Sequence, residues 1–265
     1  MPGYYTHFYF SNMLIEQLPY AARSVIDLYP DAYRLGSLGF DILRPMGRLR
    51  AELDYKHIYG LFEKTSKYIF ESGSKSQLAY MLGELTHYML DSRMNPYIYY
   101  ILEKGVPVYF GEERDFLTIE QIRDSIDIHI EKRLLNDKFY ITEMRPEPEM
   151  VSDIAEMFEK AVSEIVGYKV RGAIVESCML SIKAPKLKPY ELARYDYMNR
   201  QKKEWEPVRN DDWKTDMSVE ELFEKLLPVV NKTIDNYMSS VRSGDTLDKN
   251  WFFINYLGIL SQDKE

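Results

Sequence analysis

The sequence contains a single cysteine, Cys178, among its 265 residues, so no disulfide can form within the chain. Disulfides are rare in reducing compartments, and their absence favours a cytoplasmic protein. Cys178 lies in the largely apolar run 173–180, which favours a buried, unreactive side chain. The first residues also lack the basic and apolar regions of a secretory signal peptide.

Long apolar runs and excess positive charge are missing as well. No run of about 18 uncharged apolar residues occurs, so we expect no transmembrane helix. The 34 basic residues are outnumbered by 42 acidic ones, which gives a net charge of -8. Such a chain lacks the electrostatic attraction that duplex nucleic acid or an anionic membrane surface would require. A small phosphorylated ligand held by a metal ion is still compatible with this charge.

Internal repeats and long β-type alternation are absent, whereas apolar residues recur at helical spacing along most of the chain. This pattern predicts helices over 12–29 (with a break at Pro19), 47–71, 76–103, 118–135, 150–168, 170–182 and 218–241. Glycine or proline predicts irregular segments at 31–45, 106–116, 145–149 and 185–213. Ser218 and Glu221 have the spacing of a helix-capping box. We therefore predict an all-α fold, with one helical bundle domain over residues 1–265.

The strongest predicted helix carries three polar residues on one face. His87, Asp91 and Asn95 follow one another at intervals of four residues. An imidazole nitrogen and a carboxylate oxygen on adjacent turns can reach the same divalent ion. The neighbouring residues are apolar, so this face is suited to the protein interior. From spacing alone, however, a buried hydrogen bond or ion pair between His87 and Asp91 is the simpler interpretation.

A second pair, Asp127 and Glu131, is also separated by one helical turn. Two carboxylates at this spacing suit a hard, oxygen-rich metal site. On local grounds alone, a solvated helix face with Glu131 paired to a neighbouring base is the simpler interpretation. We expect His129 to point elsewhere, toward the surface.

The order of several segments within residues 1–140 resembles the zinc-dependent phospholipase C family, an all-helical fold with three metals that is shared with single-strand-specific nucleases. His7, in Tyr-Thr-His-Phe, resembles the family's N-terminal histidine, and the glycine-rich segment 35–42 resembles a loop that ends in a ligand, here Asp41. His57 lies where an early-helix histidine is expected, and 83–92 resembles the central His-x-x-x-Asp-Ser motif. Residues 141–265 share only the helical pattern.

The resemblance implies that Asp41, His57, His87 and Asp91 hold one metal ion. It further implies that His7 reaches a second ion, with Asp91 bridging the two. Three imidazoles and two carboxylates suit Zn²⁺. The family's N-terminal tryptophan ligand has no counterpart near this N-terminus.

A third ion would be held by Asn95, Asp127 and Glu131 according to the same resemblance. Here the sequence departs from the family, because Asn95 and Asp127 stand where the family has histidines. Oxygen ligands favour a harder ion, such as Mg²⁺, Mn²⁺ or Ca²⁺, or leave the site empty.

The function implied by the resemblance is that of a metal-dependent phosphodiesterase, a phospholipase C-like hydrolase. Its substrate would be a phospholipid-like molecule or a small phosphoester, and Asp41 would orient or deprotonate the attacking water. The altered third site leaves open a non-catalytic relative that binds a metal or a ligand. A helical interaction protein with unrelated histidines is the remaining alternative.

Overall fold

The computed structural model describes residues 2–104, 118–136, 144–185, 197–207 and 214–259. The irregular segment predicted at 106–116, and parts of that at 185–213, lie outside these residues. The described residues are predominantly helical and form no β-sheet, which confirms the all-α prediction; a single bridge pairs Trp205 with Thr215. None of the helices in the described ranges has the length and apolar character needed to span a membrane.

The first half of the chain forms α1 (Tyr4–Ile15), α2 (Tyr20–Leu28), α3 (Pro30–Ser37), the 3-10 segment η1 (Gly39–Met46), α4 (Gly47–Tyr55), α5 (Ile58–Ser72), α6 (Lys75–Lys104) and α7 (Ile119–Asn136). The second half forms α8 (Pro148–Met157), the π-helical turn η2 (Phe158–Val162), α9 (Ser163–Val166), α10 (Gly172–Leu180), α12 (Val219–Ser243) and the 3-10 turn η3 (Lys249–Trp251).

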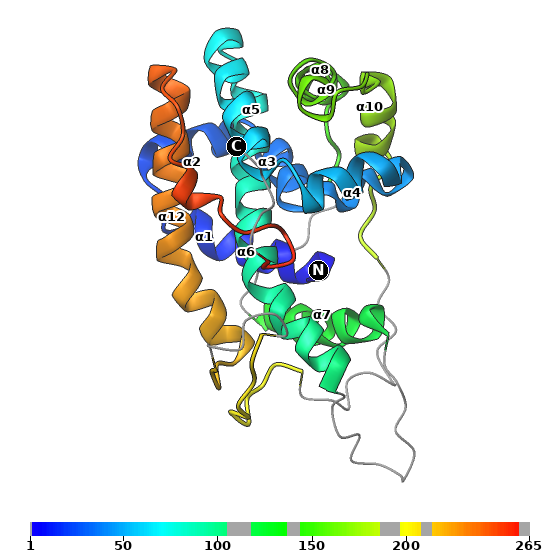
Figure 1. Ribbon diagram of the computed structural model, residues 1–265, viewed down its shortest axis with the longest axis vertical. Coiled ribbons are helices and arrows are strands. Elements are labelled where there is room, and N and C mark those ends of the chain that lie inside the picture. Colours follow the sequence, from blue (N-terminus) through cyan, green and yellow to red (C-terminus); the bar gives the residue numbers. More distant parts are fainter. Residues whose placement is uncertain (1, 105–117, 137–143, 186–196, 208–213, 260–265) are drawn as a thin grey trace.

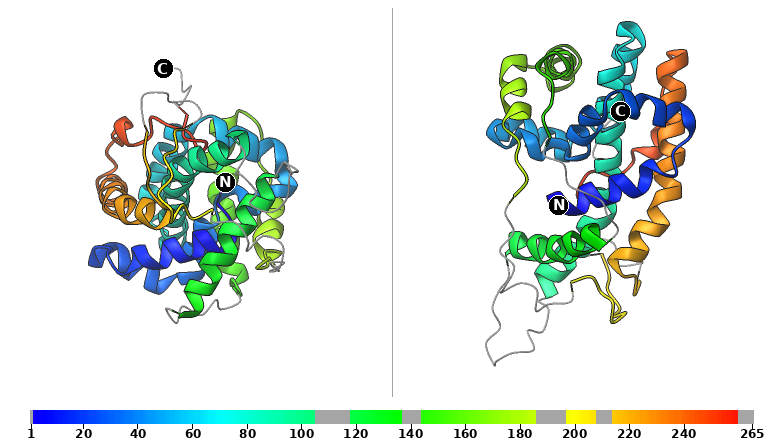
Figure 2. Two further views of the ribbon diagram at one scale, coloured as in Figure 1. Left: turned by 90° about the horizontal axis from the view of Figure 1, so that it is seen from below. Right: turned by 180° about the vertical axis from the view of Figure 1, so that it is seen from behind.

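Helix α6 is the centre of the structure. Helices α1, α2, α3, α5, α7, α8 and α12 all contact it (Figure 1). Its buried residues lie on every side, as expected for a helix that is apolar around its circumference. Seen from behind, the first turn of α1 lies close to α7 (Figure 2). The N-terminal part of α1 and the middle of α6 therefore come together in the core.

Helices α3 and α6 approach each other closely at two glycines. A Cβ atom on Gly36 would overlap the carbonyl oxygen of Tyr80, and one on Gly83 would overlap that of Tyr33. Both obstacles are backbone atoms, which cannot move aside as a side chain can. The glycines therefore set the spacing between these two helices, and α3 leads directly into the turn at Gly39, which borders the ring of His87.

Three predictions of local structure were wrong. The segment 31–45 is helical rather than a loop, because Gly36 serves the contact with α6 instead of breaking the helix. The first helix begins at Tyr4 rather than at residue 12; α1 is buried on most of its surface and so lacks a clear polar face. The predicted helix 47–71 is interrupted at His57, whose φ of 62° is left-handed.

Other predictions were confirmed. The chain breaks before Pro19, which precedes α2, and α6 spans the predicted 76–103. Ser218 and Glu221 form the capping box at the start of α12, with hydrogen bonds from Ser218 N to Glu221 Oε2 (2.9 Å) and from Glu221 N to Ser218 Oγ (3.3 Å). Cys178 is buried.

The glycine contact predicts opposite effects for two alanine substitutions. Gly83→Ala should lower the free energy of unfolding by about 1–3 kcal/mol, because the added methyl group overpacks the α3–α6 contact. Gly60→Ala should raise it by about 0.5–1 kcal/mol, because its Cβ would have no heavy atom nearer than 4.0 Å and alanine favours helix. Urea denaturation measures both; equal effects of the two substitutions would contradict a tight α3–α6 contact.

Candidate metal centre

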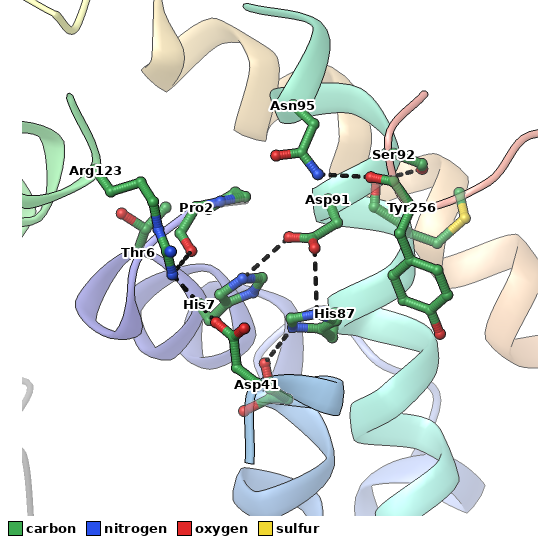
Figure 3. Close-up of polar contacts among 12 residues, drawn as sticks. Pro2, Thr6, His7, Asp41, His87, Asp91, Ser92, Asn95, Arg123 and Tyr256 are labelled. Atoms are coloured by element: carbon green, nitrogen blue, oxygen red, sulfur yellow. Dashed lines mark hydrogen bonds and ion pairs between the residues drawn. The ribbon is translucent and has the colours of Figure 1, made fainter. Parts of the chain in front are cut away.

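The imidazoles of two histidines and one carboxylate meet in the core between α1 and α6. His7 Nε2 lies 3.1 Å from Asp91 Oδ1, and His87 Nε2 lies 3.3 Å from Asp91 Oδ2. The two imidazole rings are stacked, with centroids 4.1 Å apart. Figure 3 shows the Asp91 carboxylate directed at both rings. At most 2% of any of the three side chains is exposed, so water contributes little to their solvation.

The separations between these donor atoms fit a divalent ion. Zinc binds nitrogen and oxygen at about 2.0–2.2 Å, so two donors of a tetrahedral ion lie about 3.3–3.5 Å apart. His7, His87 and Asp91 are the His, Cys, Asp or Glu side chains that the described residues bring within reach of one ion. Apart from these two close contacts with one another, their four facing atoms have no hydrogen-bond partner among the described residues. Leaving buried polar atoms without partners is costly, and a metal ion would satisfy all of them.

The orientation of His87 is fixed from its far side. Its Nδ1 lies 3.2 Å from the carbonyl oxygen of Ser37, which suits an N–H donor at Nδ1 and leaves Nε2 free to bind a metal. Gly39 borders the ring, and a Cβ at this position would overlap it. The φ of Gly39 is +58°, a conformation that glycine adopts without strain. The turn between α3 and η1 thus contacts the His87 ring and fixes its orientation.

The position of His7 depends on Asp127. The Asp127 carboxylate accepts hydrogen bonds from Tyr5 N (3.1 Å), Thr6 N (3.0 Å) and Thr6 Oγ1 (2.6 Å), at the start of α1. The first N–H groups of a helix lack partners within the helix and favour negative charge. Asp127 therefore anchors the first turn of α1, which carries His7, to α7.

Burial and mutual charge determine the proton positions. Burial and the charge of His87 lower the pKa of His7 to about 4. Burial also opposes a charge on His87, but the carboxylate of Asp91 outweighs it and raises the pKa of His87 to about 9. Burial disfavours the charged form of Asp91 too, yet the two histidines hold its pKa well below the usual range. Near neutral pH the metal-free centre is thus a neutral His7 beside an imidazolium–carboxylate pair.

A cleft of about 300 Å³ lies beside this centre; His7 forms part of its wall, whereas His87 and Asp91 do not line it. Its lining carries three basic side chains: Arg44, Arg123 and Lys183. Acidic residues line it as well, including Asp41 and Asp127, whose carboxylates already have partners. The cleft is of a size for a small molecule and offers both signs of charge.

Asp41 lies near the three-residue centre but outside it. Its carboxylate pairs with Arg50 Nη2 (2.7 Å) and with Arg123 Nη2 (3.2 Å). Arg123 Nη2 also lies 3.4 Å from the carbonyl oxygen of Pro2, so the pair ties η1, α7 and the N-terminal segment together (Figure 3). The charge of Asp41 contributes a small upward shift to the pKa of His87, and it partly offsets the lowering of the pKa of His7. Its predicted role as a metal ligand stays a prediction.

The structure places the other predicted ligands apart from the three-residue centre. His57 precedes α5 and is half-buried, and Glu131 is a half-buried residue of α7 whose charge acts on Tyr5. Asn95 is fully buried one turn beyond Asp91; its Nδ2 donates to the carbonyl oxygen of Tyr256 (2.6 Å). Its Oδ1 has no hydrogen-bond partner among the described residues. Of the three residues predicted for the third metal site, Asn95 is the closest in sequence to Asp91.

No family model, curated protein or solved structure matches the chain. The resemblance to zinc-dependent phospholipase C is therefore neither supported nor refuted by comparison.

Several residues that shape the centre were not predicted from sequence. Arg50 and Arg123, which pair with Asp41, come from α4 and α7. No spacing rule connects residues so far apart in the chain. Gly39 belonged to the quoted glycine-rich segment, but only the fold shows that it borders the ring of His87.

The pKa of His87 predicts a pH-dependent stability of the metal-free protein. Because the folded-state pKa (about 9) exceeds the ordinary histidine pKa of 6.5, the stabilisation is fully present below pH 6.5 and is lost as the pH rises through 9. The difference in free energy of unfolding between the wild type and His87→Gln should shrink by about 3 kcal/mol from pH 6 to pH 10.

Urea denaturation in the presence of a chelator measures this difference. His129→Gln, which removes a half-buried histidine of α7 outside the centre, is the control. A constant difference between wild type and His87→Gln would show that no imidazolium–carboxylate pair forms.

Proposed function

We propose that this protein is a metal-dependent hydrolase of a small phosphoester, with one divalent ion held by His7, His87 and Asp91. The observation that carries the proposal is the convergence of their buried donor atoms, which lie within 4.8 Å of one another and have no further hydrogen-bond partner among the described residues. Two imidazoles and one carboxylate favour Zn²⁺, and iron or manganese would also accept them. The resemblance of residues 1–140 to phospholipase C supplies the reaction class.

The described lining of the cleft beside the centre carries four acidic and three basic side chains, and the basic ones can receive an anionic substrate. A bound divalent ion polarises a phosphoryl oxygen and makes bound water more acidic. Arg44 and Lys183, both exposed at the cleft, can pair with phosphate oxygens. Arg123 is held in place by Asp41 and Pro2, so its guanidinium is oriented before a substrate enters. Asp127, through α1, fixes the His7 side of the site.

A non-catalytic metal-binding protein is the second candidate, and one observation favours it. Asp41, the predicted residue for activating water, is engaged by two guanidinium groups. Each of its two oxygens already contacts a guanidinium nitrogen, so the carboxylate is not free to orient a water molecule. In this alternative the ion stabilises the α1–α6 contact and no reaction follows.

Metal content distinguishes the ligand set seen in the fold from the larger set implied by the resemblance. Elemental analysis should find about one zinc or manganese ion per wild-type chain and almost none in His87→Ala. His57→Asn should retain the ion, because His57 lies outside the three-residue centre; asparagine tolerates the left-handed backbone at this position. Loss of the ion in both variants would favour the larger ligand set, and no ion in the wild type would contradict the proposed centre.

Hydrolysis should depend on both the ion and the basic side chains of the cleft. With added Zn²⁺ or Mn²⁺, the wild type should hydrolyse bis(p-nitrophenyl) phosphate, and a chelator should stop the reaction. Lys183→Gln should reduce kcat/KM about tenfold through loss of one charge-assisted contact. Lys64→Gln is the matched control, because Lys64 pairs with Glu164 on the surface and does not line the cleft. Full metal binding without turnover on any phosphoester would select the non-catalytic alternative.

A further inference from the structure

A second cavity, of about 480 Å³, lies between α6, α12 and the C-terminal segment 253–258. Most of its described lining is apolar and includes Met217, Leu222, Leu226, Val229 and Ile254. Phe253 stands at this surface with 52% of its side chain exposed, an unusual exposure for a phenylalanine. The volume is in the range of small-molecule sites, and the lining suits a hydrocarbon chain.

The charge of this groove differs from that of the whole protein. Its described lining includes two basic residues, Arg93 and Lys225, and no acidic residue, although the chain carries a net charge of -8. Arg93 is half-buried, and no described carboxylate pairs with it or with Lys225. A partly desolvated guanidinium without a counter-ion among the described residues favours an anionic group of a ligand, which it can bind through two parallel hydrogen bonds.

The groove is separate from the metal centre. Arg93 follows Asp91 by two residues, which is roughly 200° around a helix, so the two side chains leave α6 on nearly opposite faces. The cleft at His7 and the groove have no described lining residue in common. A ligand in the groove therefore does not compete with an ion at His7, His87 and Asp91.

We propose that the groove between α6 and α12 binds a free, single-chain fatty carboxylate of medium length. The alkyl chain lies along the apolar residues of α12 and the C-terminal segment, where its burial supplies most of the affinity. The carboxylate pairs with Arg93 at the wall of the groove, and Lys225 on the exposed side of α12 adds attraction at its entrance. The proposed site therefore recognises both the alkyl chain and the negative charge of the ligand.

Isothermal titration calorimetry with hexanoate, octanoate and decanoate tests both parts of the proposal. Each added methylene should tighten binding about fourfold, as expected for burial of a CH₂ group. Decanol, which has the same chain without the charge, should bind at least about tenfold more weakly than decanoate. Binding should be the same with and without a chelator, because the metal centre lies on the other face of α6.

Three variants locate the site. Arg93→Gln should weaken decanoate binding about 10- to 100-fold and leave decanol binding unchanged. Val229→Trp should weaken both ligands, because the larger side chain fills the groove while the charges remain. Lys232→Gln is the control: it also removes an exposed positive charge of α12, but it does not line the groove. Its affinities should equal those of the wild type.

Several outcomes would overturn the proposal. Equal affinities for decanoate and decanol, or no effect of Arg93→Gln, would exclude the carboxylate contact. Absence of decanoate binding would exclude the groove as a fatty-carboxylate site. This conclusion would hold even if the protein sedimented with vesicles of anionic phospholipid. If Arg93→Gln does not fold, as judged by circular dichroism, the chain-length series, the decanol comparison and Val229→Trp decide the question.

Discussion

The structure depends on one buried carboxylate, that of Asp91, held between two imidazoles in the middle of its central helix. A charge so deeply buried is tolerated only if it is paired or bound to a metal. The elements around it supply that pairing: α1 brings His7, α6 itself brings His87, and the turn at Gly39 leaves room for the ring. Asp127 on α7 then anchors the helix that carries His7. The close packing of these elements follows from the need to satisfy this one group.

The central helix also divides the molecule into two chemically different surfaces. One face of α6 carries His87 and Asp91, which face His7 beside a polar cleft lined by basic and acidic side chains. The other borders an apolar groove whose described charged residues are the cations Arg93 and Lys225. A helix buried along 30 residues can support both, because residues two positions apart point in nearly opposite directions. The proposed hydrolase site and the proposed fatty-carboxylate site therefore have no described lining residue in common, although Tyr256, between the groove residues Ile254 and Gly258, lies close to His87.

The sequence predicted those features that depend on local spacing. The pairing of His87 with Asp91 follows from their separation of one turn, and the all-α fold follows from the helical periodicity. The approach of His7 depends on tertiary packing and was expected only through the resemblance. The ion pairs that engage Asp41 join distant segments and have no local signature. Gly36 was misleading, because a glycine that admits a neighbouring backbone looks the same in sequence as one that ends a helix.

Anomalous diffraction at the zinc absorption edge, from crystals of the zinc-loaded protein, tests the central claim most directly. The account predicts a single strong peak in the core, about 2.0–2.2 Å from His7 Nε2, His87 Nε2 and an oxygen of Asp91. A peak coordinated instead by Asp41 and His57, or no peak within reach of Asp91, would contradict it. In that case the two histidines and the carboxylate would form an ion-paired core cluster, and the metal-dependent function would be lost with the site.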